Sequence, residues 1–254
     1  MSLEQLRNHL TDLRLFTAAA EIENVLASQK KSVPIDWIES LLARELDARR
    51  ERAVQRRIKD GCFPEVTTLE AFDWNFNPDI DAARIKRLAD LDFVKQRRIA
   101  LFLGKPGTGK THLALAIGVR AATRGYRVAC TSVKRLGQRI AIARQRGELD
   151  RLFSKLLAAD LWILDDWGVV SMTRDIAEEV FDLLDRRKHS SAMILTSNRD
   201  VSEWGEVFPD PVLASAAIDR LFEQAEILLF NGKSYRLRGR ITVGDLDTAS
   251  KARQ

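Results

Sequence analysis

The stretch Gly104-Lys105-Pro106-Gly107-Thr108-Gly109-Lys110-Thr111 matches the phosphate-binding pattern G-x-x-x-x-G-K-[ST] at every fixed position. The apolar run 99–103 before it has the length and composition of a buried strand. The run 113–117 after it is compatible with a helix. Strand, glycine-rich turn and helix in this order are the setting that the motif requires, which favours a nucleotide site over a chance glycine turn.

Each residue type in this loop has a physical reason. Glycine adopts backbone conformations closed to other residues, so successive N–H groups can point inward at an anion. The positive end of the following helix adds to that field. Lys110 is expected to place its charge on the β- and γ-phosphates, and Thr111 to offer a hydroxyl to Mg²⁺. The residues predicted to bind ATP are Gly104, Pro106, Gly107, Thr108, Gly109, Lys110 and Thr111.

Two acids follow the apolar run 161–164, which reads as a second buried strand. Open parallel sheets bind ligands beyond the carboxyl ends of their strands. We therefore expect Asp165 to hold Mg²⁺ through its water shell and Asp166 to polarise the attacking water. Alone, two such acids would equally suit a turn or a helix cap.

Two further side chains complete the predicted site. Asn198 ends the apolar run 192–195 and its polar continuation, where an amide could contact both the γ-phosphate and the attacking water. Arg220 lies on a predicted helix before the last strand, and an arginine supplied by a neighbouring copy can accelerate hydrolysis. The alternative for Arg220 is an ion pair with Asp219 or Glu223.

Composition limits the class of protein. The chain has 254 residues, enough for one or two domains, and a net charge of +5. It has no stretch of about 18 consecutive apolar residues and no secretory pattern at its start, so we expect a cytoplasmic protein that does not contact membranes. Cys62 and Cys130 lie far apart without metal-like spacing and are expected to be free thiols, Cys130 in the core.

Basic residues gather in two regions, 49–59 and 134–155, and clusters of this kind suit a polyanion such as duplex DNA. Helical spacing places Arg135, Arg139 and Arg146 on one outward stripe, which is the first candidate for contacts with DNA phosphates. The 49–59 cluster is the second. The alternative in both cases is an ordinary solvated helix face.

The pattern along the chain predicts an α/β fold, with a parallel sheet between helices, behind a small helical domain. We expect an N-terminal helical interaction or DNA-binding domain over 1–60, a linker over 61–97, an ATPase domain over 98–240 and a frayed tail over 241–254. The apolar stripe of the first helix runs from Leu3 to Phe16. Five strands are predicted at 99–103, 127–131, 161–165, 192–197 and 226–230, and five helices at 110–123, 133–146, 149–158, 174–188 and 212–223.

Three aromatic residues mark the linker. Phe72, Trp74 and Phe76 alternate with Asp73 and Asn75, which predicts an extended stretch. The aromatic rings could fasten the linker onto the core, which we favour, or lie near the adenine.

The four site elements in this order resemble the AAA+ P-loop ATPases, within the clade of the replication initiator DnaA and the helicase loader DnaC. More narrowly, the chain resembles the IstB-like ATP-binding helpers of insertion-sequence transposition over nearly its whole length. The segments that carry this resemblance are GKPGTGKTHLALAIG, LWILDDWG, TSNRDVSEWGEVFPDPVLASAAIDRL and GKSYRLRG. The run 202–208 is the most family-specific, because nucleotide chemistry does not require it.

The resemblance implies a homo-oligomer with ATP sites at subunit interfaces, ATP-dependent binding of duplex DNA, and delivery of that DNA to a transposase of the same element. It assigns Asp165 to the metal, Asp166 and Asn198 to catalysis, and Arg220 to the neighbouring site.

The chain departs from the family pattern in two places. Trp162 and Trp167 flank the acidic pair where smaller aliphatic residues are usual, which affects local packing. Only 24 residues follow Phe230, too few for a full helical lid domain, so we expect no lid arginine to sense the nucleotide. Arg236 and Arg238 are the arginines left that could approach the site from a neighbouring copy.

Other functions fit parts of the same pattern. A DnaC-like helicase loader would share the ATPase and differ in its partner. A nucleotide-gated DNA-binding scaffold would hydrolyse little ATP. A small-molecule P-loop kinase would gain nothing from Arg220 or from the basic clusters.

Overall fold

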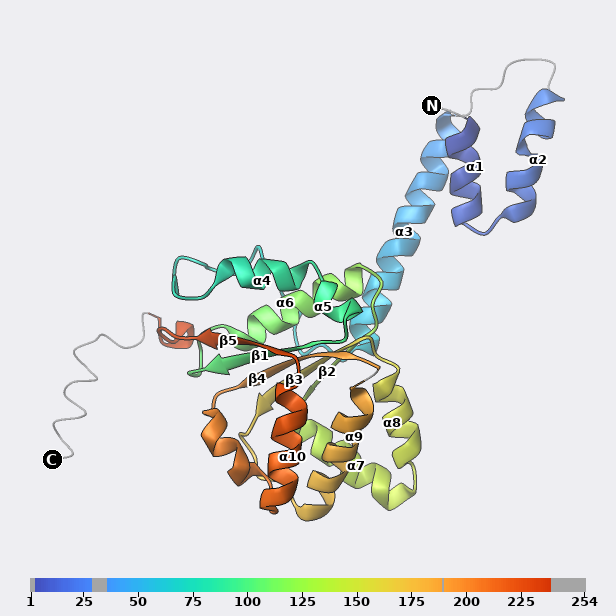
Figure 1. Ribbon diagram of the computed structural model, residues 1–254. Coiled ribbons are helices and arrows are strands. Elements are labelled where there is room, and N and C mark those ends of the chain that lie inside the picture. The colour runs from blue at the N-terminus through green and yellow to red at the C-terminus, as the bar shows by residue number, and fades with distance from the viewer. Residues whose placement is uncertain (1–2, 29–35, 189, 239–254) are drawn as a thin grey trace. The chain divides into compact units, whose positions relative to one another are not determined.

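The computed structural model describes residues 3–28, 36–188 and 190–238. The chain divides into two compact units, Met1–Arg56 and Arg57–Gln254, which are described separately (Figure 1). The tail predicted to be frayed, 241–254, lies outside the described residues.

The first unit is helical, as its periodicity predicts. It contains α1 (Leu3–Asp12), α2 (Phe16–Ala27) and most of α3 (Asp36–Asp60). Leu6, Leu10 and Ala19 form its small buried centre. Phe16 does not continue the stripe of α1, because Arg14 has a φ of 60° and ends that helical path. Phe16 instead begins α2 with 63% of its surface exposed.

The second unit is built on five parallel strands in the order β2-β3-β4-β1-β5. The strands are β1 (Ile99–Gly104), β2 (Val128–Ser132), β3 (Leu161–Trp167), β4 (Ala192–Ser197) and β5 (Ala225–Phe230). β1 lies between β4 and β5, with Leu101 paired to Leu195 on one side and Ile227 on the other. Because the strands are parallel, all their carboxyl ends meet at one edge of the sheet.

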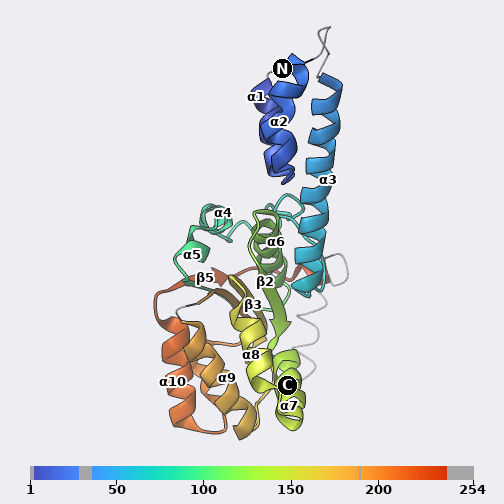
Figure 2. The same ribbon diagram turned by 90° about the vertical axis from the view of Figure 1, so that its right-hand side faces the viewer.

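Helices cover both faces of this sheet, which gives the predicted three-layer α/β fold (Figures 1 and 2). On one face lie α4 (Ala82–Ala89), α5 (Asp92–Lys95) and α6 (Lys110–Thr123). The helices on the other face are α7 (Val133–Arg146), α8 (Leu149–Leu157), α9 (Arg174–Arg187) and α10 (Pro211–Phe222). Two buried cores result, one on each side of the strands. Cys130 is in one of them, as predicted.

Residues 61–97 differ from the sequence prediction. The extended stretch predicted around Phe72 is wrong, because residues 69–76 form turns. Further along, Asp81 caps α4 by accepting a hydrogen bond from the backbone N of Arg84, and Ile85 and Leu88 pack into the core. This part of the chain therefore belongs to the body of the second unit.

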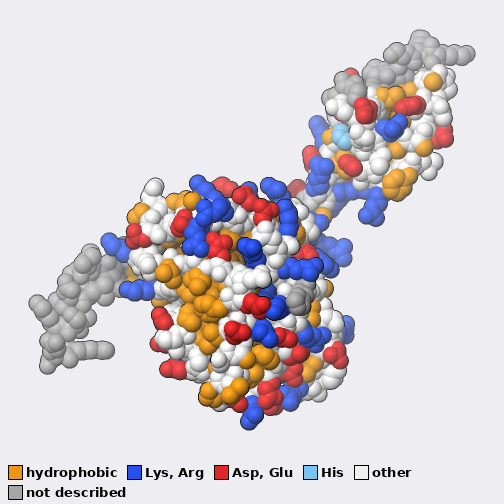
Figure 3. Space-filling view, viewed as in Figure 1, with side chains coloured by type: hydrophobic (Ala, Val, Ile, Leu, Met, Phe, Trp, Pro, Cys, Tyr) orange, Lys and Arg blue, Asp and Glu red, His pale blue; other side chains and the backbone are white. Residues whose placement is uncertain are grey.

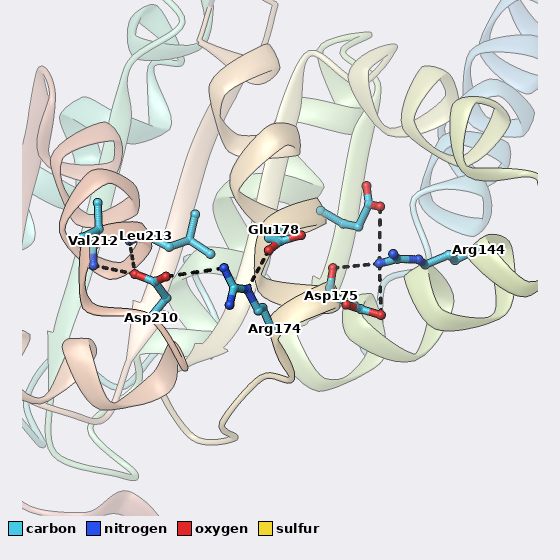
Figure 4. A network of polar contacts seen from close by, with 8 residues as sticks. Arg144, Arg174, Asp175, Glu178, Asp210, Val212 and Leu213 are labelled. Carbon is cyan, nitrogen blue, oxygen red and sulfur yellow. Dashed lines mark hydrogen bonds and ion pairs between the residues drawn. The ribbon is translucent and has the colours of Figure 1, made fainter.

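A network of ion pairs joins the helices of the second face (Figure 4). Arg144 on α7 contacts Asp175 and Glu179 on α9 at 3.4 and 3.8 Å. Arg174 contacts Glu178 at 3.0 Å and Asp210 at 3.9 Å, and Asp210 caps α10. Such exposed pairs add little stability, so the packing of α7, α9 and α10 depends mainly on their buried apolar residues.

The two tryptophans that flank the acids are buried. Trp162 donates a hydrogen bond to the carbonyl oxygen of Leu156, and Trp167 packs edge-on against Trp204. Trp204 belongs to the η1 turn (Val201–Val207), so the family-specific run 202–208 serves to fill this core. Across the described ranges, no helix combines the length and the apolar character needed to cross a bilayer.

Candidate functional site

The glycine-rich loop joins β1 to α6 in left-handed backbone geometry. Gly104, Gly107 and Gly109 have φ angles of 145°, 78° and 105°. A Cβ atom on Gly104 would lie 2.2 Å from the carbonyl oxygen of Phe230, and one on Gly109 would lie 2.5 Å from the Phe72 ring. Glycine is therefore required here both for conformation and for space.

Lys110 is folded inside this loop. Its side chain is almost fully buried, and Nζ donates hydrogen bonds to the carbonyl oxygens of Gly104 at 2.7 Å and Lys105 at 2.6 Å. Burial lowers the pKa of Lys110 to about 8, against the opposing effect of Asp165 and Asp166. Burial removes water from the ammonium group of Lys110. A bound triphosphate would compensate for this loss by interacting with the positive charge.

The two acids at the end of β3 are brought to the same side by a bulge. Successive side chains of a regular strand point to opposite faces. The β3–β4 register shifts between Leu164 and Trp167, and Asp166 has a φ of 59°, a conformation that aspartate tolerates better than most residues. As a result both Asp165 and Asp166 line one cavity.

Asp165 accepts two hydrogen bonds on the same oxygen. Thr111 donates to Oδ1 at 2.8 Å, and Thr196 on β4 donates to it at 2.5 Å. A hydroxyl and a carboxylate side by side beside the phosphate loop are the hard oxygen ligands that Mg²⁺ uses together with nucleotide phosphates. In the described ranges no group of three or more His, Cys, Asp and Glu side chains could hold a metal.

Asp166 lies beside Asn198, because β3 and β4 are neighbouring strands that end at the same edge of the sheet. The Asn198 amide donates to Asp166 Oδ1 at 3.3 Å. Desolvation and the nearby Asp165 raise the pKa of Asp166, while Arg236, Lys110 and Asn198 oppose the change. A carboxylate with a raised pKa accepts a proton more readily than an ordinary aspartate does.

These groups face a cavity of about 410 Å³. Residues 106–111 of the phosphate loop line it together with Asp165, Asp166 and Asn198. His112, which directly follows the motif, also lines the cavity. Other lining residues come from parts of the chain far from the motif, and they include Glu65, Phe72, Phe76, Asn77, Tyr235 and Arg236. A cavity of this size falls within the range of small-molecule sites.

The linker aromatics fasten their segment to the core, as favoured from the sequence, and their contact with adenine stays a prediction. Phe72 and Trp74 pack against the buried core, which fastens the segment to the sheet. Phe72 and Phe76 also line the cavity, where a purine could stack. Phe76 stands edge-on to Tyr235 with ring centroids 5.0 Å apart.

Sequence reasoning missed the wall formed by residues after β5. Tyr235 and Arg236 belong to the short η2 turn (Tyr235–Leu237), and the Tyr235 backbone N donates to the carbonyl oxygen of Gly107 at 2.9 Å. Arg236 lines the cavity of its own chain, whereas the sequence suggested an approach from a neighbouring copy. Arg238 pairs instead with Asp73 at 2.8 Å. The available signal was the segment GKSYRLRG itself, whose place in the fold no local pattern fixes.

Arg220 does not line this cavity. Its guanidinium pairs with Asp185 on α9 at 2.7 Å and with Asp219 at 3.5 Å. The Asp185 contact raises the pKa of Arg220. Glu223, the other partner considered from the sequence, contacts Lys188 at 2.7 Å.

The basic residues of the two clusters have different surroundings. On α7, Arg135 and Arg146 are exposed, and Arg139 is half-buried beside a second cavity. Arg144 is held in the ion-pair network. In the 49–59 cluster, ion pairs with acids on the same helix engage Arg49, Arg50 and Arg52.

Binding of ATP at pH 9 is expected to be accompanied by uptake of nearly one proton. With a pKa of about 8, Lys110 is mostly neutral in the free protein at pH 9, and a bound triphosphate would raise its pKa and recharge it. The phosphates themselves are already ionised there. Titration calorimetry in buffers of different ionisation enthalpy measures the uptake.

A titration at pH 7 is the control, because Lys110 is then already charged and little uptake is expected. Absence of proton uptake at pH 9 would show that the lysine stays charged without nucleotide.

Comparison with known proteins places this site in a family. The family model described as IstB-like ATP binding protein matches residues 5–242. An insertion sequence IS21 protein of Pseudomonas aeruginosa, with ATP binding in its name, is 37% identical over 246 residues, covering 96% of this chain and 93% of that one. An insertion sequence IS5376 protein of Geobacillus stearothermophilus, similarly named, is 36% identical over 203 residues and covers 80% of this chain and 81% of its own.

Solved structures agree on the fold. DnaI superposes with a TM-score of 0.55 at 22% identity, covering 65% of this chain and 91% of that one. AMPPCP-bound DnaA from Aquifex aeolicus gives a TM-score of 0.55 at 21% identity, covering 73% and 59%. The fold is that of the AAA+ P-loop ATPases related to DnaA and DnaC. By the match across its length, the chain belongs to the IstB-like ATP-binding protein family.

Proposed function

We propose that this protein hydrolyses ATP to ADP and phosphate, and that in its ATP-bound state it binds target duplex DNA and delivers it to the transposase of the same insertion sequence. The observation that carries the hydrolytic part is the convergence of Lys110, Asp165, Asp166 and Asn198 on one cavity. Relatives from insertion sequences support the transposition part.

Each group has a defined task in this proposal. Lys110 neutralises charge on the β- and γ-phosphates. Thr111 and Asp165 would hold Mg²⁺, which supplies further neutralisation of the phosphate charge. Asp166 accepts the proton of the attacking water, for which a raised pKa suits it, and Asn198 orients that water and the γ-phosphate.

The proposal includes an assembly of identical subunits in which Arg220 reaches the γ-phosphate of a neighbour. Two observations support it. Arg220 lies outside its own cavity, and β5 is an edge strand that exposes Ile227 and Leu229. Figure 3 shows hydrophobic side chains gathered on one face of the second unit. Exposed apolar patches commonly mark contacts between proteins.

The proposal also places DNA on basic surfaces of the protein. Arg135, Arg139 and Arg146 on α7 and the basic part of α3 are its candidates, and the helical first unit is a candidate interaction domain. Contacts to phosphates without base reading give weak sequence preference and steep salt dependence.

The test is phosphate release and duplex binding by the purified full chain. We expect the wild-type protein to retain a labelled duplex only with ATP and Mg²⁺, and duplex DNA to change the rate of phosphate release. The Lys110→Ala variant should lose both properties, because the phosphate charge is then uncompensated. Co-purification should bring down a transposase.

Two results would contradict the proposal. Phosphate release that ignores duplex, with no duplex retained, would favour a small-molecule kinase. Recovery of a replicative helicase in place of a transposase would favour a helicase loader.

A further inference from the structure

A second cavity, of about 280 Å³, lies at the β2 edge of the sheet, at the opposite end of the strand order from β5. Its floor is apolar and comes from Ala129 and Cys130 on β2 and from Leu156 and Ala159 around the end of α8. The last turn of α3 and the following residues close one side. None of the residues that line this second cavity lines the ATP cavity.

Four cationic side chains surround this floor, and they come from four different elements or their ends: Arg57, Arg127, Arg139 and Lys155. Asp60 is the one acid among the described residues that line the cavity. Arg127 is paired with Asp160 at 3.6 Å. For Arg57, Arg139 and Lys155, the described parts of the chain provide no carboxylate within ion-pair distance.

Two of these unpaired cations, Arg57 and Arg139, are half-buried. Placing a charge against apolar surface removes part of its hydration, and an uncompensated charge there is costly. A bound anion would offset this loss of hydration by pairing with the two guanidinium groups. The structure therefore brings together one arginine from each basic cluster of the sequence, at a place suited to an anion.

The surroundings of the cavity favour a phosphate group over an extended peptide as the bound anion. An extended peptide would bind by adding a strand to β2, but that edge is already capped. Gly61 accepts a hydrogen bond from the backbone N of Cys130 at 2.8 Å and lies against the carbonyl oxygen of Val128. A phosphate group needs no strand edge, and its oxygens can accept from guanidinium groups on several sides.

We propose that this cavity is a second phosphate-binding site, separate from the ATP site. The volume lies just below the usual range for complete small-molecule ligands, which suits a phosphate and its attached sugar better than a whole nucleoside triphosphate. In the context of the proposed function, on which this part rests, the expected source of the phosphate is the backbone of duplex DNA.

Cys62 provides a reporter at the site itself. It lines the cavity and is exposed, whereas Cys130 is buried. The experiment measures the rate at which iodoacetamide alkylates Cys62 in the full chain, saturated with AMPPCP and Mg²⁺ so that the ATP cavity is filled. The alkylation rate is measured under three conditions: without a further ligand, with a labelled duplex at ten times its measured Kd, and with inorganic pyrophosphate.

We expect the duplex to slow alkylation about tenfold, because only the free fraction of sites reacts. The double variant Arg57→Gln, Arg139→Gln should lower the slope of log K against log salt by about 2. The double variant Arg135→Gln, Arg146→Gln is the matched control on exposed residues outside the cavity. At ten times its own Kd for duplex, it should keep the Cys62 protection. Unchanged AMPPCP affinity verifies folding of both variants.

The outcomes separate the two proposals. If the wild-type protein binds duplex while Cys62 reacts at its free rate, the phosphate site is refuted and the proposed function stands. If duplex does not bind but pyrophosphate protects Cys62, the site is supported with free phosphates as its ligands, and the proposed function fails. Protection by neither probe, without duplex binding, refutes both.

Discussion

Replacement of Asp166 by asparagine is expected to lower the turnover number for ATP hydrolysis by about 10²–10⁴-fold, the usual contribution of a positioned general base. Binding of ATP should change little, because Lys110 and the loop backbone remain. Asparagine is a well-matched substitution, since it also tolerates the positive φ of 59° found at this residue. Single-turnover phosphate release and AMPPCP affinity are the two measurements.

The pH dependence provides the control for this variant. Because the pKa of Asp166 is raised, the wild-type rate should fall with acidification at a higher pH than an ordinary aspartate would give. The pH–rate profile of the variant should lack this decrease at low pH. Turnover at the wild-type level in Asp166→Asn would reject the role of base for this residue.

Substitution of Arg220 by alanine is expected to reduce ATP hydrolysis by about 10³–10⁵-fold, as loss of an arginine supplied in trans does in related chemistry. The effect on stability should be small, because the Arg220–Asp185 pair is partly exposed. Asp185→Asn is the matched control: it breaks the same ion pair but keeps the guanidinium, and should hydrolyse ATP nearly as well as the wild-type protein.

Mixing the Arg220→Ala and Lys110→Ala chains tests whether the arginine acts between subunits. A Lys110→Ala subunit still carries Arg220 and can serve the intact site of its neighbour, so mixed assemblies should regain activity that neither variant has alone. No recovery under conditions where the chains exchange, or an equal loss in Asp185→Asn, would assign Arg220 to a contact within its own chain.

Much of the ATPase fold could be predicted because its signals are local. All five strands occur within two residues of their expected bounds, since each is an apolar run closed by polar residues. The α4 helix was missed although its signals were present: an aspartate cap at Asp81 and apolar residues at Ile85 and Leu88. The aromatic alternation around Phe72 suggested an extended strand there, but the rings are held by tertiary packing instead.

The part of the candidate site that lies at the ends of the strands could be predicted from the sequence. Asp165, Asp166 and Asn198 meet because parallel strands finish at one edge. The positions of Tyr235 and Arg236 depend on how a short turn folds back over the phosphate loop, which no periodicity encodes. Arg57 and Arg139 are 82 residues apart in sequence, so their meeting at one cavity could only be found in three dimensions.

The hydrogen bonds and the ion pair between the turns before α4 and the turn after β5 have a consequence for nucleotide exchange. Asn77 and Lys233 exchange two hydrogen bonds of 3.0 Å, and Asp73 holds Arg238, so the turns before α4 and the turn after β5 are tied to each other. Tyr235 in turn holds the phosphate loop through Gly107. Release of ADP from the cavity would thus require these two segments to separate from each other. A neighbouring molecule that bound to either segment could therefore control the rate of nucleotide exchange.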